Sequence, residues 1–321
     1  MATSRRRIVL CIAAGADPPP GWDEGLRHAD IVIARGRDEA RAQLADADGM
    51  FLWDFASRVL DGMPLPPRLA WIHAGSLGVD AVLTPEVAAS PVTVSNTRGL
   101  FERPIAEYVL GWMLAIAKDF RASFRLQDRG QWLWRPTRGL TGHRVALVGP
   151  GAIGAEIHAL LAAVGCSVDC YGRQDVPRHP QFGRISSLAA LPDALAEVDT
   201  TILALPLTSV TRGLVDARWL AAMRPGSTLV NIGRGALIDE AALIEALRLG
   251  RPGIAALDVF QQEPLPPGHP FWTMEQVYLS PHMSGDVEGW QQQAVGQFIA
   301  NLARWCRGEA LLNVVDKSKM R

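Results

Sequence analysis

The sequence has 321 residues, of which 48% are hydrophobic and 20% are charged, and its formal net charge is -1. This length suggests about two domains, and the near-neutral charge excludes the basic surface that nucleic-acid-binding proteins carry. No run of about 20 apolar residues occurs, so we expect no membrane span.

The first residues allow two interpretations. Ser4-Arg5-Arg6-Arg7 followed by the apolar run Ile8 to Ala14 resembles a short secretion signal or a twin-arginine signal. We favour a first β-strand, because the apolar run is short and Ile8 to Ile12 has strand-like residues. The four cysteines lack the spacing of a metal site, so we expect reduced thiols, no bound metal and a cytosolic protein. They are Cys11, Cys166, Cys170 and Cys306.

Short apolar segments alternate with polar stretches over the first part of the chain, as in a domain with a parallel sheet. The predicted strands are Ile8 to Ile12, Ile31 to Ala34, Gly49 to Trp53, Leu69 to Ile72 and Val92 to Val94, and Glu39 to Ala45 is a predicted connecting helix.

The pattern changes after the Asn96-Thr97-Arg98-Gly99 turn. Apolar residues between Pro104 and Arg125 keep helical periodicity over more than four turns. We predict one long helix here, which makes this region a candidate crossing between domains. Trp132 and Trp134 follow in a polar segment, where they could pack in the core or anchor an interface, and we favour core packing.

Val145 to Gly154 places an apolar run directly before Gly149, Gly151 and Gly154. This is a G-x-G-x-x-G motif after a strand, and Ala155 to Val164 has the periodicity of a following helix. In a dinucleotide-binding turn the first glycine permits the tight turn, the second lets the backbone reach a pyrophosphate, and the third lets helix pack on strand. The sequence therefore predicts a dinucleotide site, with an ordinary glycine turn as the alternative.

A second array of strands and helices follows this turn. The predicted strands are Ser167 to Tyr171, Thr200 to Ala204, Thr228 to Ile232, Gly253 to Val259 and Val277 to Leu279, with helices at Ala241 to Leu249 and Val287 to Cys306.

The end of the second strand predicts the choice of cofactor. A dinucleotide fold that binds NAD usually has a carboxylate there for the ribose hydroxyls, whereas an arginine favours the 2′-phosphate of NADP. This chain has Gly172 and Arg173 at that place. We therefore expect NADP in preference to NAD. Two alternatives stay open: Asp169 as the ribose ligand, although it comes earlier than the usual spacing of about 20 residues, and Arg173 as an ordinary surface residue.

Three later segments, together with the glycine turn and Leu205-Pro206-Leu207-Thr208, reveal a family resemblance. They are Asn231-Ile-Gly-Arg-Gly-Ala-Leu-Ile-Asp239, Asp258-Val-Phe-Gln-Gln-Glu-Pro-Leu265 and Leu279-Ser-Pro-His-Met-Ser-Gly285. In order and spacing they resemble the D-isomer-specific 2-hydroxyacid dehydrogenases, and in character the glyoxylate/hydroxypyruvate reductases. The resemblance spans essentially the whole chain.

The resemblance implies NAD(P)H-dependent reduction of a small 2-oxo acid to the D-hydroxy acid. His282 would supply the proton, Glu263 would stabilise the protonated imidazole, and Arg234 would bind the substrate carboxylate and polarise its carbonyl. Each residue alone has a plain structural interpretation, as a loop or turn residue. Glu263 argues against formate dehydrogenases, which resemble this family but have glutamine there.

Further site residues come from the same resemblance. The segment His73 to Asp80 matches a substrate loop, with the backbone N–H groups of Leu77 and Gly78 as donors and the hydroxyl of Ser76 as an additional contact. The residues implied for the cofactor are Gly149, Gly151, Ala152, Ile153, Gly154, Arg173, Leu205, Pro206, Thr211, Ile232, Asp258 and His282. Asp258, expected near the nicotinamide carboxamide, could instead cap a helix.

We thus expect an α/β chain with two doubly wound parallel-sheet domains. Residues 1–98 and 290–321 would form a flavodoxin-like substrate domain, closed by the strand-like Asn313-Val314-Val315, and residues 99–289 a Rossmann coenzyme domain, with the site in the cleft between them. The resemblance implies a homodimer formed by the coenzyme domain, in which Trp132 or Trp134 reaches the neighbouring cleft. Alternatives are a phosphite or formate dehydrogenase, and a non-enzymatic corepressor-like scaffold, which the short segment after Val315 disfavours.

Overall fold

The structure is a computed structural model that describes residues 5–320, so Ser4 of the possible export signal lies outside the described residues. The chain divides into two compact units. The first contains Met1–Phe101 and Val287–Arg321, and the second contains Glu102–Asp286. Both are α/β domains built on a largely parallel sheet, as the sequence predicts.

The sheet of the first unit has five parallel strands in the order β2-β1-β3-β4-β5, which is the flavodoxin-like order. Its strands are β1 (Arg7–Ile12), β2 (Asp30–Arg35), β3 (Gly49–Leu52), β4 (Trp71–Ala74) and β5 (Thr93–Ser95). Its helices are α1 (Gly36–Leu44), α2 (Pro85–Ala89) and α9 (Trp290–Cys306), with short 3-10 turns at Trp22–Arg27 and Lys317–Met320.

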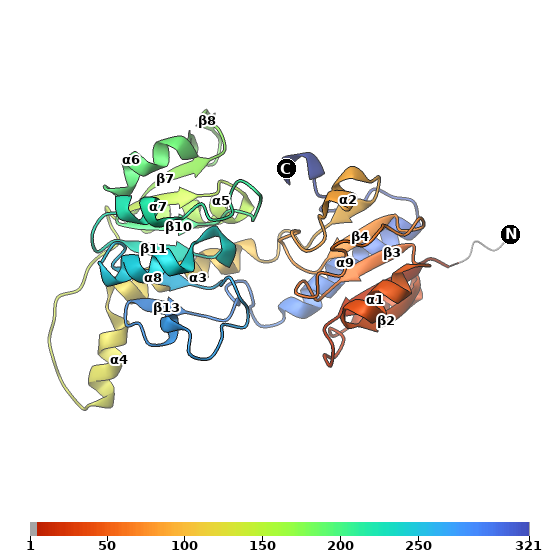
Figure 1. The fold of residues 1–321 in the computed structure, drawn as a ribbon, viewed down its shortest axis with the longest axis horizontal. Coiled ribbons are helices and arrows are strands. Elements are labelled where there is room, and N and C mark those ends of the chain that lie inside the picture. Colours follow the sequence, from red (N-terminus) through yellow and green to blue (C-terminus); the bar gives the residue numbers. More distant parts are fainter. Residues whose placement is uncertain (1–4, 321) are drawn as a thin grey trace. The chain divides into compact units, whose positions relative to one another are not determined.

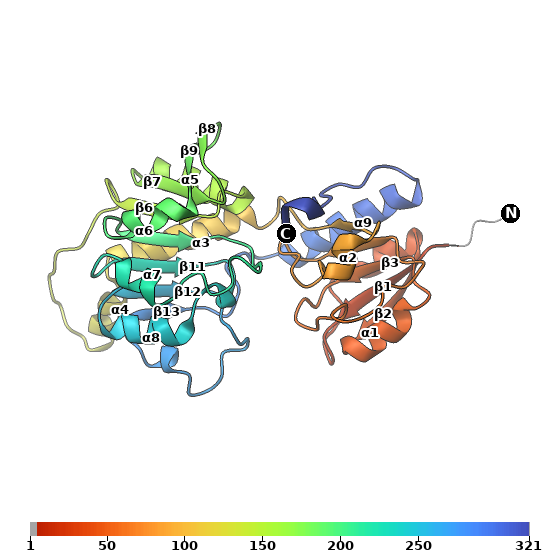
Figure 2. The ribbon, with the colours of Figure 1, turned by 45° about the horizontal axis from the view of Figure 1, so that its top comes forward.

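Helix α9 covers one face of this sheet and α1 and α2 lie on the other face (Figures 1 and 2). Phe298 of α9 stacks on Phe51 of β3, with ring centroids 4.1 Å apart, and on Trp71 of β4 at 5.6 Å. Aromatic burial on this scale contributes strongly to a core. The C-terminal segment then returns to the sheet edge, where Val314 forms an antiparallel bridge with Ser95.

The second unit has an eight-stranded sheet in the order β13-β12-β11-β10-β6-β7-β9-β8, parallel except for β8. Its strands are β6 (Arg144–Val148), β7 (Ser167–Gly172), β8 (Val176–His179), β9 (Gly183–Ser187), β10 (Thr200–Leu203), β11 (Thr228–Asn231), β12 (Ile254–Leu257) and β13 (Val277–Leu279). Its helices are α3 (Glu102–Ala117), α4 (Phe120–Asp128), α5 (Ala152–Ala163), α6 (Leu191–Leu195), α7 (Ala217–Ala222) and α8 (Glu240–Arg248), with 3-10 turns at Leu188–Ala190, Gly235–Leu237 and Pro270–Trp272.

The predicted single helix from Pro104 to Arg125 is wrong. Helix α3 ends at Ala117, and Asp119 takes a left-handed conformation (φ 51°) before α4 begins at Phe120. The Asp119 carboxylate accepts a hydrogen bond from the Ala122 N–H at 3.4 Å. Aspartate is a preferred N-cap residue and tolerates the left-handed region, so it can restart a helix inside an apolar periodic run.

The predicted core packing of the two loop tryptophans is also wrong. Trp132 is 101% exposed and Trp134 is 82% exposed. Both lie in the extended segment that follows α4 and stands away from the sheet (Figure 1). The hairpin of β8 and β9 was not predicted, because its few apolar residues lack a clear alternation.

In residues 5–320 no helix is long and apolar enough to cross a membrane. The four cysteines are free thiols. Among the described residues, no group of three or more His, Cys, Asp and Glu side chains could hold a metal ion.

His73 of β4 is fully buried among aromatic rings. Its Nδ1 lies 2.8 Å from the Ser95 hydroxyl, which also accepts a hydrogen bond from the Trp71 indole at 2.9 Å. Burial without a neighbouring carboxylate lowers the pKa of His73 to about 3. The ring is therefore neutral in the folded protein over most of the accessible pH range.

We predict that the free energy of unfolding falls as the pH drops from about 6.5 toward 3, because over this window the unfolded chain binds a proton at His73 that the folded chain excludes. His73 alone adds a slope of up to about 1.4 kcal/mol per pH unit. Denaturant titrations across this window should give a smaller slope for His73→Asn than for the wild type. Equal slopes for His73→Asn and wild type would contradict the prediction.

Candidate active site

The site residues of the second unit converge because parallel strands end at the same edge of a sheet. The chain runs from β6 outward to β7 and then returns to build β10, β11, β12 and β13 on the other side of β6. The strand order therefore reverses between β6 and β10, which is where ligands bind in open α/β sheets. Gly149, Leu205, Arg234, Asp258 and His282 all follow strand ends at this edge.

The glycine turn after β6 brings backbone segments into contact. Gly149 has φ 118°, and a Cβ atom there would lie 2.5 Å from the Ala204 carbonyl oxygen. A Cβ at Gly154 would lie 2.2 Å from the Gly149 carbonyl oxygen. Both positions thus require glycine, the first for turn conformation and close approach and the second for packing of α5 on the turn.

Gly151 differs from these two glycines, since a Cβ there would meet no heavy atom within 4 Å among the described residues. It is the N-cap residue of α5, and no side chain caps the helix at this point. The first N–H groups of α5, including those of Ala152 and Ile153, therefore begin the helix beside open space. Such a helix start suits an anionic group, so the residues present fit a dinucleotide pyrophosphate.

The turn after β10 is held by its own threonines. The Thr211 hydroxyl donates to the Pro206 carbonyl at 2.7 Å and accepts from the Thr208 N–H at 2.8 Å. The backbone of Leu205 lies against the glycine turn, because its nitrogen would be 3.1 Å from a Cβ at Gly149. Thr211 thus shapes the loop that presents Leu205 and Pro206.

The turn after β11 presents Arg234. The Asn231 side chain accepts from the Gly233 N–H at 3.1 Å and donates to the Arg234 carbonyl at 3.0 Å. A Cβ at Gly235 would lie 1.9 Å from the Phe260 carbonyl carbon. This close backbone approach brings the Arg234 turn onto the loop after β12, which carries Glu263.

Asp258, at the end of β12, holds the loop that carries His282. Its Oδ1 accepts from the Ser280 hydroxyl at 2.6 Å and the Met283 N–H at 2.9 Å, and its Oδ2 accepts from the Ser284 N–H at 3.0 Å. The side chain is 1% exposed. These bonds show that Asp258 positions the loop of His282. The sequence analysis placed Asp258 near the nicotinamide and did not predict this positioning.

His282 and Glu263 form the central pair of the site. The His282 Nδ1 lies 2.7 Å from Glu263 Oε2, and each side chain is 30% exposed. The backbone of His282 is left-handed, with φ 52°, and its N–H donates to the Asp258 carbonyl at 2.8 Å. Because Glu263 engages Nδ1, Nε2 is the ring nitrogen that can exchange a proton with a ligand.

Several groups set the charge of this pair. Burial alone would raise the pKa of Glu263, but the hydrogen bonds from His282 and the Phe260 N–H and the positive charges of His282 and Arg234 lower it below its usual value. Glu263 is therefore ionised at neutral pH. Nearby, burial raises the pKa of Asp286, against the opposing effect of His282. The arrangement joins an imidazole, a carboxylate and a guanidinium.

Gly172 and Arg173 mark the end of β7 beside the glycine turn, because the Gly149 N–H donates to the Tyr171 carbonyl at 2.9 Å. Asp169 lies earlier in β7, paired with Ala146 in the interior of β6. The strand end next to the turn is thus occupied by Gly172 and Arg173, and Asp169, the alternative ribose ligand, lies three residues before Gly172.

The predicted substrate loop belongs to the first unit and follows β4. The Ser76 hydroxyl donates to the Gly78 carbonyl at 2.7 Å, and the Asn96 amide donates to the Leu77 carbonyl at 2.7 Å. The carbonyls are thereby fixed, whereas the N–H groups of Leu77 and Gly78 have no hydrogen-bond partner among the described residues. The Ser76 hydroxyl proton is used within the loop.

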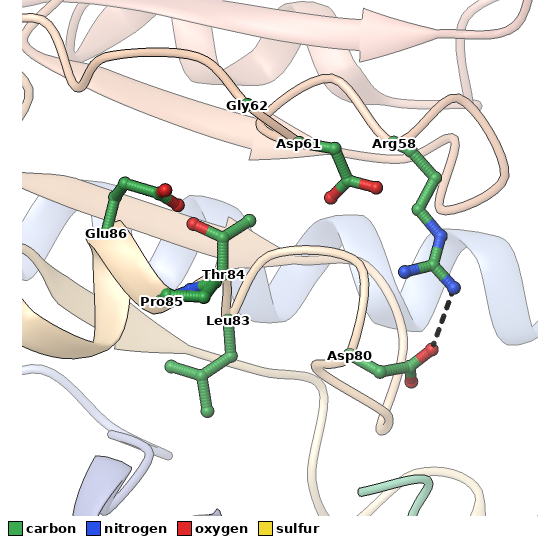
Figure 3. Close-up of a pocket in the computed structure, with 8 residues that line it drawn as sticks. All are labelled: Arg58, Asp61, Gly62, Asp80, Leu83, Thr84, Pro85 and Glu86. Carbon is green, nitrogen blue, oxygen red and sulfur yellow. Dashed lines mark ion pairs between the residues drawn. The ribbon is translucent and has the colours of Figure 1, made fainter. Parts of the chain in front are cut away.

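A pocket of about 260 Å³ lies beside this loop in the first unit (Figure 3). Arg58 reaches across it toward Asp80, with 3.9 Å between nitrogen and oxygen. Asp80 closes the segment His73 to Asp80, so this ion pair links the loop after β3 to the substrate loop. Asp61, Thr84 and Glu86 line the remainder.

Two positioning groups were missed by the sequence analysis. The Tyr108 hydroxyl of α3 hydrogen-bonds to the Ser280 hydroxyl and so extends the Asp258 network. The Asn231 side chain braces the Arg234 turn. Ser280 and Asn231 are in the quoted motifs, but Tyr108 is distant in sequence, and no local pattern points to it.

Comparison with known proteins gives a consistent result. Residues 110–284 match the sequence model of the D-isomer specific 2-hydroxyacid dehydrogenase, NAD binding domain. A glyoxylate/hydroxypyruvate reductase A of Arabidopsis thaliana is 32% identical over 255 residues, 78% of this chain and 79% of that protein.

Two solved structures are similar over nearly the whole chain. A D-isomer specific 2-hydroxyacid dehydrogenase of Xanthobacter autotrophicus, in complex with NADPH and MES, has a TM-score of 0.79 and 30% identity, covering 99% of this chain and 100% of that one. An NADPH-dependent glyoxylate/hydroxypyruvate reductase of Sinorhizobium meliloti, in complex with NADP and sulfate, has a TM-score of 0.79 and 26% identity, covering 98% and 100%.

The two glycines Gly235 and Gly151 make a matched pair for a stability test. We predict that Gly235→Ala costs about 1–3 kcal/mol of stability, because its Cβ would overlap the Phe260 backbone. Gly151→Ala should leave stability within about 0.5 kcal/mol, since its Cβ enters open space. Chemical denaturation of both variants tests this, and an unaffected Gly235→Ala variant would refute the close approach.

Proposed function

This chain belongs to the D-isomer specific 2-hydroxyacid dehydrogenase family, and we propose that it reduces a small 2-oxo acid of the glyoxylate or hydroxypyruvate kind to the D-2-hydroxy acid, with NADPH as the preferred cofactor. The observation that carries this proposal is the 2.7 Å contact between His282 and Glu263, with the charge of Arg234 acting on the same carboxylate.

Reduction of a ketone needs a proton for the oxygen while hydride reaches the carbon. The reduced nicotinamide supplies the hydride when it is bound. In our proposal protonated His282 gives the proton from Nε2 to the substrate oxygen, so the C=O bond becomes an alcohol and the imidazole becomes neutral. Ionised Glu263 stabilises the imidazolium beforehand and holds its ring in place.

Arg234 binds the anionic substrate in this proposal. Its guanidinium can hold the carboxylate in a charge-assisted contact and polarise the adjacent carbonyl. The N–H groups of Leu77 and Gly78 in the first unit are the donors proposed there for an anionic substrate group, and Ser76 shapes that loop through its bond to Gly78. Preorganised amides of this kind stabilise anions without a full charge.

NADPH is proposed over NADH because Gly172 stands at the strand end where NAD sites carry a carboxylate, and Arg173 follows it. The turn residues Gly149, Gly151, Ala152, Ile153 and Gly154 hold the pyrophosphate in this proposal. Leu205, Pro206, Thr211, Ile232 and Asp258 form or support the nicotinamide end. Two similar structures are described in complex with NADPH or NADP, which supports the same choice.

A homodimer formed by the coenzyme domain is part of the proposal. Helix α4 and the segment after it expose Phe120, Phe124, Trp132, Leu133 and Trp134. Exposed apolar residues gathered in this way mark an interaction surface, and a second copy of this chain is the occupant that family membership favours. Trp132 or Trp134 of one subunit would then reach the substrate site of the other. The four free cysteines favour a cytosolic location.

Two other functions would use the same fold. A phosphite or formate dehydrogenase would oxidise its anion with NADP, and oxidation assays with both anions separate it from a 2-oxo acid reductase. A corepressor-like scaffold would bind the cofactor tightly without turnover. The paired His282 and Glu263 favour an enzyme over a scaffold, because binding a nucleotide alone needs neither residue.

We predict NADPH oxidation on addition of glyoxylate, hydroxypyruvate or phenylpyruvate, measured as a decrease in the absorbance of NADPH.

His282→Ala should lower kcat by about 100-fold or more, because the proton donor is lost, while the NADPH dissociation constant stays unchanged. Glu263→Gln should also lower kcat, since the imidazole loses the carboxylate that holds its ring in place. Glu245→Gln, on the exposed side of α8, is the control. Absence of turnover with all three acids would refute the proposed activity.

For the dimer, we predict that sedimentation gives twice the chain mass of 34.8 kDa. The double variant Phe124→Ser/Trp132→Ser should sediment as a monomer, because it removes two large apolar side chains from the surface of α4 and its following segment. Leu249→Ser is the matched control, since Leu249 is 82% exposed elsewhere in the same unit. A double variant that stays dimeric would exclude this surface as the interface.

A further inference from the structure

Gly172 stands at a position of the proposed cofactor site that has little room for a side chain. It is the last residue of β7, and the preceding carbonyl accepts the hydrogen bond from the Gly149 N–H. A Cβ at Gly172 would lie 2.9 Å from Pro150 Cγ and 3.2 Å from Pro150 Cδ. It would also lie 3.1 Å from Ile185 Cγ2 on β9.

The backbone does not explain this glycine. Gly172 is not among the residues with positive φ, so an L-amino acid could take its conformation. The obstacle is the neighbouring side chains. A pyrrolidine ring has little freedom because it is closed on its own backbone, and Ile185 is β-branched and 5% exposed, so its methyl group cannot turn away easily.

We propose that Pro150, the second residue of the G-x-G-x-x-G turn, determines cofactor specificity by keeping position 172 free of any side chain. The ring fills the space that the Cβ of a ribose-binding carboxylate would need. This inference rests on the proposed use of NADPH and deepens it. Pro150 excludes a ribose-binding carboxylate from position 172, and the positive charge of Arg173 attracts the 2′-phosphate.

This role of Pro150 does not interfere with the proposed binding of the pyrophosphate. A proline has no N–H group to donate, but the proposed donors to the pyrophosphate are the first N–H groups of α5, which follow Gly151. The space at Gly151 is open. Asp169 does not stand at this strand end, because it pairs with Ala146 in the middle of β6, three residues before Gly172.

The first arm of the test measures crowding by thermal unfolding, without any cofactor. Gly172→Ala should lower Tm by at least about 3 °C, because it adds a methyl group to filled space. In a Pro150→Ala background the same substitution should lower Tm by less than half as much. Equal losses in both backgrounds would overturn the proposal.

The second arm measures dissociation constants of NADPH and NADH by isothermal titration calorimetry. Gly172→Asp alone should weaken NADPH binding without improving NADH binding. Pro150→Ala/Gly172→Asp should bind NADH at least tenfold more tightly than Gly172→Asp does. Arg173→Ala, the control for attraction, should weaken NADPH binding about tenfold and leave NADH binding unchanged. A Gly172→Asp variant with wild-type Tm and improved NADH binding would overturn the proposal.

The two arms separate this inference from the proposed function. Wild-type protein that binds NADH as tightly as NADPH, or binds neither, contradicts the proposed cofactor. The unfolding series would still show whether Pro150 crowds position 172, since it needs no ligand.

Discussion

Close contact between backbone segments at one edge of the second sheet is the constraint on which the site depends. Gly149 approaches Ala204, Gly233 approaches Leu205, and Gly235 approaches Phe260, at distances that leave no room for a Cβ. These contacts join the turns after β6, β10, β11 and β12 into one continuous surface. The charge of Arg234 can act on the Glu263 carboxylate because the turns that carry these two residues touch through main chain. Main-chain contacts of this kind allow little adjustment.

The polar groups then fix what the glycines bring together. Both carboxylate oxygens of Asp258 accept hydrogen bonds from the loop of His282, and the Tyr108 hydroxyl extends this network by its hydrogen bond to Ser280. A buried carboxylate that accepts three hydrogen bonds is expensive to displace. The left-handed backbone of His282 is held by this network, which therefore determines where the imidazole can meet Glu263. The residues that position the His282 loop and the residues of the proposed proton transfer thus lie on different neighbouring segments.

Sequence patterns predicted the elements that obey local rules. The alternation of strands and helices, the glycine turn and the three later motifs were enough for the fold class and for the His282 and Glu263 pair. They failed where a distant or competing interaction decides the structure. Asp119 ends a helix whose apolar periodicity continues past it, and Trp132 and Trp134 are exposed although tryptophan favours burial. Tyr108 reaches Ser280 across a separation in sequence that no local pattern records.

Two sequence patterns of the proposed cofactor site, the glycine turn and the end of the second strand, depend on each other in this chain. The glycine turn and the residue at the end of the second strand are usually interpreted separately, the first for phosphate binding and the second for the ribose. In this chain they touch, because Pro150 lies over the position of a Cβ at Gly172. The identity of one residue therefore restricts the other. In the cofactor site that we propose, Arg173 would add attraction for the 2′-phosphate, and the crowding at Gly172 would disfavour a carboxylate there. The x positions of G-x-G-x-x-G, which the motif leaves unspecified, can thus carry information about cofactor choice when their side chains face the neighbouring strand end.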